Sequence, residues 1–198
     1  MKCIFCDIDH SKIENTIIEE TNNFYIVPTL GSLVDGYVLI VTKRHINSMS
    51  ELNDIELNEY QNIITKYQNV FKKIYNKTPI VFEHGTPNQN SEIKANSVTH
   101  AHTHIVNINF TNEKEIIEKY NFNEIKELNE INKNKNYIKY IYDNKKYITY
   151  DFPSISQLMR ILVAKELGYE DKFDWKKERF EENIISTIKR IKGELKWK

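Results

Sequence analysis

The sequence has little of what usually marks phosphate loops and membrane spans. Its 198 residues include only five glycines, and it has no Gly-rich phosphate loop of either common type. No apolar run approaches the length of a transmembrane helix, and the N-terminus lacks the apolar core of a signal peptide. The formal net charge is zero, which argues against a general nucleic-acid binder. We therefore expect a cytoplasmic protein that does not bind membranes or, as its main role, nucleic acid.

What is present is the composition of an ordinary globular protein, with 40% hydrophobic and 28% charged residues. The length fits one domain, or one domain with an extension, and it is sufficient to bury a core.

Histidines at alternating positions are the most informative feature. His100, His102 and His104 lie within five residues and lead into Ile105 and Val106, which favour a strand. Alternate side chains of a strand point to one face, so the three imidazoles should form a row. Such a row could bind a metal ion, or one neutral imidazole could attack phosphorus as a nucleophile.

The segment 97–106 resembles the signature of the histidine triad (HIT) proteins, in which three histidines alternate with apolar residues. Thr103 departs mildly from this pattern because it is half-polar. The resemblance implies a nucleotide hydrolase or transferase that acts at an α-phosphate, with His102 as the nucleophile. Histidine at the third position, His104, is typical of the hydrolases.

The two cysteines form a Cys-x-x-Cys pair, Cys3 and Cys6, which is typical of a metal site or a redox pair. No thioredoxin-like βαβ unit follows, so we favour a metal. The HIT resemblance implies that His45 and His100 complete a structural Cys₂His₂ zinc site.

The resemblance also implies a set of substrate-binding residues. Ser97 matches a hydroxyl that faces the phosphate, and Asn96 replaces a more usual glutamine. Leu30 is expected to cover a base, whereas Thr29 stands where several relatives hold the ribose with an acid. Glu83 stands where the family has an amide that reaches the phosphate. A carboxylate there would repel phosphate unless it were protonated or turned away.

We expect an α+β, HIT-like fold, in which a long helix packs on an antiparallel sheet. The helix is predicted from Asp54 to about Tyr75, with Asn53 and Glu56 as a capping box. Its apolar stripe is either core or subunit-contact surface, so a homodimer is left open. The predicted organisation is a catalytic domain over 1–110 and an extension over 111–198 that packs on it.

In the extension, the patterns predict a short helix near 124–130 and a hairpin of 137–142 with 146–150. They also predict a helix capped by Ser156 and a last helix over 176–192. Arg160 or Lys176 could reach a second phosphate; solvation at the surface is the alternative for each.

The leading hypothesis is an enzyme that hydrolyses nucleotide conjugates, such as dinucleoside polyphosphates or nucleoside phosphoramidates, through a nucleotidyl-histidine. One alternative is a nucleotidyltransferase of the same family. Another is a metallohydrolase that uses all three histidines, which lacks support from a nearby carboxylate motif. A third is a non-catalytic nucleotide-binding module, suggested by the departures at Thr29 and Glu83.

Overall fold

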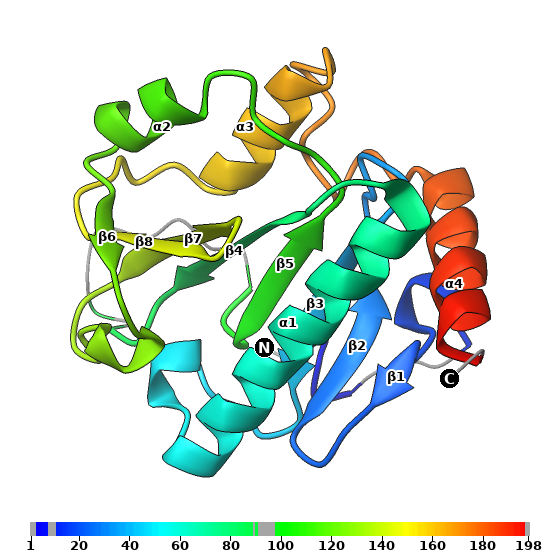
Figure 1. Cartoon of the computed structure of the whole chain (residues 1–198), viewed down its shortest axis with the longest axis horizontal. Helices are drawn as coiled ribbons and strands as arrows, with labels where there is room; N and C mark the ends of the chain where they lie inside the picture. Colours follow the sequence, from blue (N-terminus) through cyan, green and yellow to red (C-terminus); the bar gives the residue numbers. More distant parts are fainter. Residues whose placement is uncertain (1–2, 8–10, 89, 91–97, 197–198) are drawn as a thin grey trace.

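The computed structural model describes residues 3–7, 11–88, 90 and 98–196. One antiparallel sheet of eight strands forms its centre, in the order β1-β2-β3-β5-β4-β7-β8-β6 (Figure 1). The strands are β1 Glu19–Glu20, β2 Phe24–Pro28, β3 Tyr37–Thr42, β4 Ile80–Gly85, β5 His102–Val106, β6 Asn123–Ile125, β7 Tyr137–Tyr142 and β8 Lys145–Thr149. The helices are α1 Asp54–Tyr75, α2 Glu113–Lys119, α3 Leu158–Glu166 and α4 Glu181–Lys196. The predicted α+β fold, with an antiparallel sheet and a long helix on it, is confirmed.

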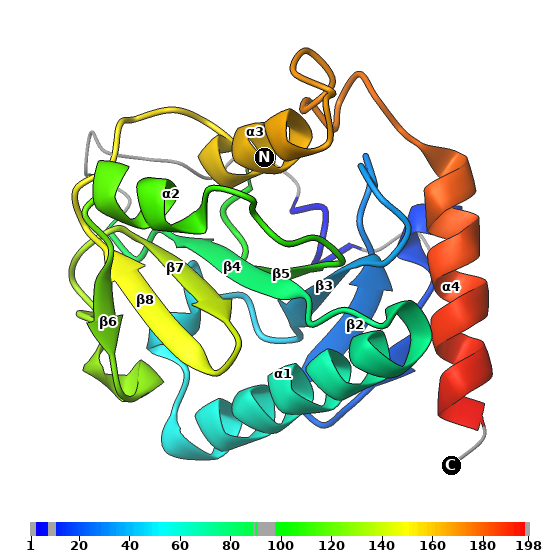
Figure 2. The same cartoon turned by 45° about the horizontal axis from the view of Figure 1, so that its top comes forward.

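Helices cover both faces of the sheet. Figure 2 shows α1 on one side and α2 and α3 on the other, with α4 upright beside α1. The core is divided accordingly. One cluster joins α1 and Ile191 of α4 to the first face, and the other joins Leu158, Met159 and Val163 of α3 to the second. Among the described residues, no helix is long and apolar enough to cross a bilayer.

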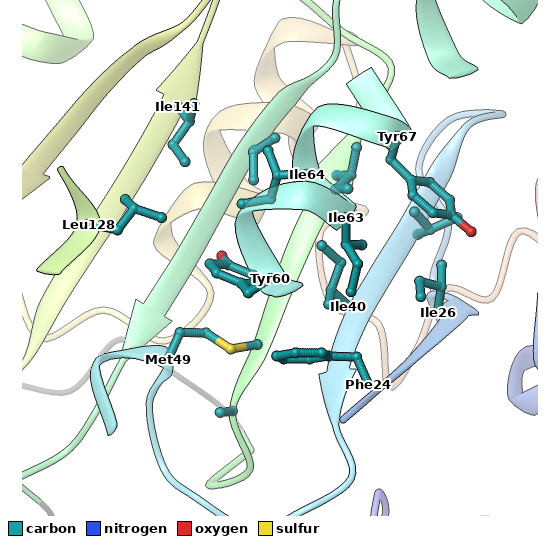
Figure 3. Packing of buried hydrophobic residues seen from close by; sticks show 14 of the residues in the cluster. Phe24, Ile26, Ile40, Met49, Tyr60, Ile63, Ile64, Tyr67, Leu128 and Ile141 are labelled. Atoms are coloured by element: carbon teal, nitrogen blue, oxygen red, sulfur yellow. The ribbon is translucent and has the colours of Figure 1, made fainter. Parts of the chain in front are cut away.

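Helix α1 has the predicted bounds. The side chain of Asn53 accepts a hydrogen bond from the backbone N–H of Glu56, and the side chain of Glu56 accepts one from the backbone N–H of Asn53. Both halves of the capping box therefore form. From Tyr60 onward the apolar stripe of the helix is buried against the sheet, where Tyr60 and Ile63 pack with Phe24 and Ile40 (Figure 3), whereas Ile55 in the first turn is exposed. In this chain the stripe is therefore core.

Strand β5 lies at the centre of the sheet, between β3 and β4. It begins at His102, so His100 precedes the strand instead of belonging to it. The predicted row of three is thus a pair on the strand, His102 and His104, with His100 in the bend before them. Opposite these histidines, Thr103 faces α1, and its hydroxyl is 2.7 Å from that of Tyr60. This bond accounts for a half-polar residue at that point of the motif.

Residues beyond 110 continue the same sheet. Strand β7 pairs with the free edge of β4, and β8 and β6 follow it outward. The hairpin of β7 and β8 turns at Asp143 and Asn144, both with positive φ, as a two-residue turn requires. The short helix predicted near 124–130 is wrong in its first half, because β6 pairs there with β8. The last helix begins at Glu181, five residues later than the predicted Lys176.

Candidate active site and metal cluster

A cavity of about 340 Å³ opens on the face of the sheet covered by α3. Its size is at the lower end of the range for small-molecule sites. Four parts of the chain form its wall: the N-terminal segment, the end of β2 with the loop after it, strands β3 to β5, and the C-terminal segment. The lining residues used below are Phe5, Thr29, Leu30, His84, His102, His104, Gln157, Arg160, Trp175 and Arg179. The two predicted catalytic histidines therefore share one cavity with two of the predicted substrate residues.

His102 is oriented by the backbone of the residue two before it. Its Nδ1 lies 2.7 Å from the carbonyl oxygen of His100. A carbonyl only accepts hydrogen bonds, so the neutral ring carries its proton on Nδ1 and keeps a lone pair on Nε2. Burial lowers the pKa of His102, although the bond to the His100 carbonyl and the negative charge of Glu83 act in the opposite direction. His102 is thus a neutral imidazole with a free lone pair at the cavity.

His104 is more deeply buried than His102 and is fixed on several sides. Its ring stacks on Phe82 at 4.4 Å between centroids, and the ring of His102 lies 5.0 Å away. Its Nδ1 is 2.9 Å from the hydroxyl of Tyr37 on the adjacent strand. Burial, followed by the charges of His102, His84 and Arg160, holds the pKa of His104 well below its usual range. His104 is therefore neutral as well.

The four predicted metal ligands come together. One ligand atom each from Cys3, Cys6, His45 and His100 lie within 4.8 Å of one another. The Nε2 of His100 is 2.7 Å from the carbonyl oxygen of Thr42 and must donate to it, which leaves the Nδ1 lone pair facing the thiols at 3.4 and 3.6 Å. Two thiols and two imidazoles at this spacing fit a tetrahedral site.

Glu83 is turned away from the cavity. Its side chain lies on the α1 face, where one oxygen accepts from Met49 N at 2.7 Å and the other from Lys139 Nζ at 2.6 Å. Both side chains of the Glu83–Lys139 pair are 1% exposed. Lys139 also donates to the hydroxyl of Tyr60, which contacts Thr103. The negative charge of Glu83 is therefore balanced by Lys139 on the α1 face of the sheet, and the carboxylate does not face the cavity.

Two of the remaining predicted substrate residues line the cavity, and the other two lie outside the described part of the chain. Leu30 lines the cavity, as predicted. Thr29 also lines it but is only 4% exposed, and its hydroxyl donates to the Leu30 carbonyl at 3.2 Å. Asn96 and Ser97 lie outside the described residues, so their roles stay predictions.

The C-terminal segment fastens the loop between β2 and β3. Arg160 Nη2 donates to the Gly31 carbonyl at 2.7 Å, and Asn183 Nδ2 donates to that of Ser32 at 2.7 Å. Gly31 has a φ of +69°, and a Cβ there would lie 2.7 Å from the Cα of Trp175. Only glycine allows this approach. The cavity wall thus depends on residues from both ends of the chain.

Sequence reasoning missed several cavity residues. His84 follows Phe82 by two positions on β4, and Phe82 pairs with His104, so strand alternation alone places His84 on the triad face. Arg160 is buried at 3% exposure, so surface solvation is the wrong expectation for it, whereas Lys176 is exposed. Trp175 gave no local signal, because it reaches the cavity only through the fold of the C-terminal segment.

The fold and the histidine pair beside a Cys₂His₂ cluster define a protein of the histidine triad class. The model of a protein family described as "Scavenger mRNA decapping enzyme C-term binding" matches residues 2–120. The chain belongs to this family.

Curated relatives carry the same class in their names. A protein described as uncharacterised and HIT-like from Methanocaldococcus jannaschii is 28% identical over 105 residues, which cover 52% of this chain and 77% of that protein. The protein named hit of Bacillus subtilis is 25% identical over 104 residues, covering 52% of this chain and 69% of the relative. The prediction of a HIT protein is confirmed.

Two solved structures are similar at lower identity. A zinc-bound histidine triad family protein from Mycobacterium smegmatis aligns with a TM-score of 0.44 and 16% identity, over 57% of this chain and 79% of that one. A HIT-like protein from Bartonella henselae aligns with a TM-score of 0.39 and 16% identity, over 46% of this chain. The second alignment spans 63% of the Bartonella chain, which is less than two thirds of its length.

Proposed function

We propose that the protein hydrolyses nucleotide conjugates at the α-phosphate, through a nucleotidyl intermediate on His102. One observation carries the proposal: the bond from His102 Nδ1 to the His100 carbonyl leaves the Nε2 lone pair free at a cavity that also holds His104. A neutral imidazole can attack phosphorus without a separate base.

In the first step, the Nε2 lone pair of His102 forms a bond to phosphorus, and the bond from phosphorus to the leaving group breaks. The leaving group keeps the electron pair. The imidazole becomes positively charged, and the His100 carbonyl, 2.7 Å from Nδ1, stabilises that charge. Water then attacks phosphorus and the bond to Nε2 breaks. The products are a nucleoside monophosphate and the free histidine, with the proton of water released.

The substrates we propose are dinucleoside polyphosphates or nucleoside phosphoramidates. Leu30 and Phe5 supply apolar cavity wall for a base, and Arg160 supplies positive charge. The description of the matching family names a scavenger mRNA decapping enzyme, and an mRNA cap is itself a dinucleoside triphosphate. A cap dinucleotide therefore belongs among the candidate substrates.

We also propose that Cys3, Cys6, His45 and His100 hold one structural zinc ion. Four protein ligands leave no open position for substrate, so the zinc would stabilise the fold and take no part in the chemistry. The site would tie the N-terminal segment, which contributes Phe5 to the cavity, to the residue just before the triad strand.

The test is to incubate the protein with a panel of nucleotide conjugates, identify the products, and quench single turnovers at neutral or alkaline pH for intact-mass analysis. Phosphorus–nitrogen bonds to histidine are acid-labile, so an acid quench would destroy the intermediate. We expect one nucleotidyl adduct on the peptide that contains His102. The matched control is His102→Ala, which should bind nucleotide, remain folded, form no adduct and lose nearly all turnover. An adduct on another residue, or full activity in His102→Ala, would overturn the mechanism.

Transfer of the nucleotidyl group to an acceptor other than water would appear in the same panel as a product that contains the acceptor. Tight nucleotide binding with no turnover of any conjugate would instead identify a binding module.

A further inference from the structure

Helix α3 places a fixed positive charge in the cavity wall. Arg160 is 3% exposed, and its guanidinium donates to two backbone carbonyls, from Nη2 to Gly31 at 2.7 Å and from Nε to Phe173 at 3.1 Å. Among the described residues, no carboxylate lies within 4.0 Å of it, and Nη1 is buried without a hydrogen-bond partner. A guanidinium does not lose its proton in a protein, so this position is always positively charged. A buried cation without a counter-ion is costly and calls for a functional explanation.

The charge lies against Tyr37. The guanidinium carbon of Arg160 is 5.4 Å from the centroid of the Tyr37 ring, and Tyr37 is fully buried on β3. The Tyr37 hydroxyl is in turn 2.9 Å from His104 Nδ1. Arg160 also acts on the phenol oxygen itself, because its charge and its hydrogen bond lower the pKa of Tyr37 against the larger rise caused by burial. A phenol oxygen beside a cation presents its lone pairs to the cation and turns its proton away. The proton of Tyr37 is thereby directed to Nδ1 of His104.

We propose that Arg160, acting through Tyr37, holds His104 in the tautomer whose proton is on Nε2, so that His104 faces the cavity as a hydrogen-bond donor. Arg160 is then a positioning residue that lies outside the triad motif. His102 has the opposite tautomer, because the His100 carbonyl takes its Nδ1 proton. Two neighbouring histidines are thus prepared for different tasks, one as a nucleophile and one as a donor.

The surroundings of His104 support a neutral ring. The groups that face it are His102 on its own strand, His84 on β4, Tyr37 on β3 and Arg160 on α3. Only Arg160 carries a permanent charge, which opposes a second positive charge on the imidazole. Burial and these neighbours together lower the pKa of His104.

The role of the His104 N–H in a reaction rests on the proposed function. An N–H on Nε2 could stabilise the negative charge that develops on a phosphoryl oxygen or on the leaving group. The tautomer itself does not depend on any reaction and can be measured without substrate.

The test is nitrogen-15 NMR of the histidine rings in the full-length protein, which distinguishes a proton on Nδ1 from one on Nε2. In the wild type we expect His102 with its proton on Nδ1 and His104 with its proton on Nε2. Arg160→Met removes the charge and the donors but keeps an apolar chain of similar length, and Tyr37→Phe removes the hydroxyl. In both variants we expect His104 to lose the single Nε2–H tautomer. Arg160→Lys keeps the charge and should retain it.

The matched control is Arg179→Met. Arg179 also lines the cavity, but it is exposed and lies 3.7 Å from Glu181, so its removal should leave the tautomer of His104 unchanged. If Arg160→Met does not fold, as judged by its melting curve, Tyr37→Phe still decides the question. A proton on Nδ1 of His104 in the wild type would overturn the proposal. The same would follow from an Nε2–H tautomer that persists in Tyr37→Phe.

Kinetics separates this proposal from the proposed function. In Arg160→Met, kcat should fall by roughly 100-fold, the cost of losing one preorganised donor, while KM changes by less than about threefold. Arg160→Lys should recover most of kcat. If the tautomers change as expected but no conjugate is turned over by the wild type, the proposed function fails and the role of Arg160 stands.

Discussion

Lys139 offers the sharpest test of how the triad strand is supported. Replacing it with methionine leaves Glu83 as a buried carboxylate that keeps its hydrogen bond from the backbone N–H of Met49 but loses its counter-ion. Breaking a buried ion pair by removing one partner typically costs about 3–5 kcal/mol. For a chain of this size, that corresponds to a fall in melting temperature of roughly 6–20 °C. The loss should extend to the triad, because Lys139 also bonds to Tyr60, which contacts Thr103 between His102 and His104.

The measurement is urea unfolding of Lys139→Met, followed by the double variant Lys139→Met with Glu83→Gln. The neutral amide removes the unpaired charge and keeps an acceptor for Met49, so the double variant should recover at least about 2 kcal/mol of the loss. Lys114→Met is the control, because the Lys114–Glu118 pair is exposed and 3.8 Å apart. The urea midpoint of this variant should not change measurably. A cost below about 1 kcal/mol for Lys139→Met, or a double variant less stable than the single one, would refute the reasoning.

Three further outcomes are expected. Gently purified protein should contain about one zinc ion per chain, and Cys6→Ser should lower both zinc content and melting temperature; metal-free, well-folded protein with reactive thiols would contradict this. Burial and the charge of His102 lower the pKa of His84 to about 3. The neutral His84 side chain therefore makes its full contribution to the free energy of unfolding above about pH 6.5, and that contribution is lost as the pH falls towards 3. His84→Gln should therefore flatten the decline in unfolding free energy between pH 6.5 and 5 by up to ~1.4 kcal/mol per pH unit, and an unchanged slope would argue against a neutral His84. Truncation after Phe110 removes β7, the outer partner of β4, and should yield insoluble protein or altered substrate preference; unchanged stability and specificity would contradict this.

Local chemistry in the sequence was sufficient for some elements. The bounds of α1 follow from Asn53 and Glu56, because a capping box acts within one helical turn. The hairpin of β7 and β8 follows in the same way from Asp143 and Asn144 at its turn, although Lys145, which the predicted strand 146–150 left out, already belongs to β8. Each of these elements is determined by residues only a few positions apart.

Other elements depend on partners distant in the chain. Residues 123–125 form a strand because β8 offers an edge, and no nearby residue indicates that. Helix α3 begins after Gln157, whose φ is 64°, so the predicted cap at Ser156 is wrong; the packing of α3 over the sheet determines where it starts. Similarly, the HIT motif revealed His102 and His104, but the partners that orient His104 come from β3 and α3. Tertiary packing decides such contacts, and a local pattern does not record them.

The sheet order also implies a sequence of events during synthesis. The four residues of the Cys₂His₂ cluster have all been made once His100 has been added. Strand β4 has no outer partner until residues 137–142 have been made, and the cavity wall is incomplete until Arg160 and Arg179 have been added. Because chains fold from the N-terminus as they emerge, the four Cys₂His₂ side chains can come together on the ribosome well before the cavity closes. A nascent chain would therefore hold His102 and His104 in an open half-site until the segment that carries Arg160 and Arg179 has been made.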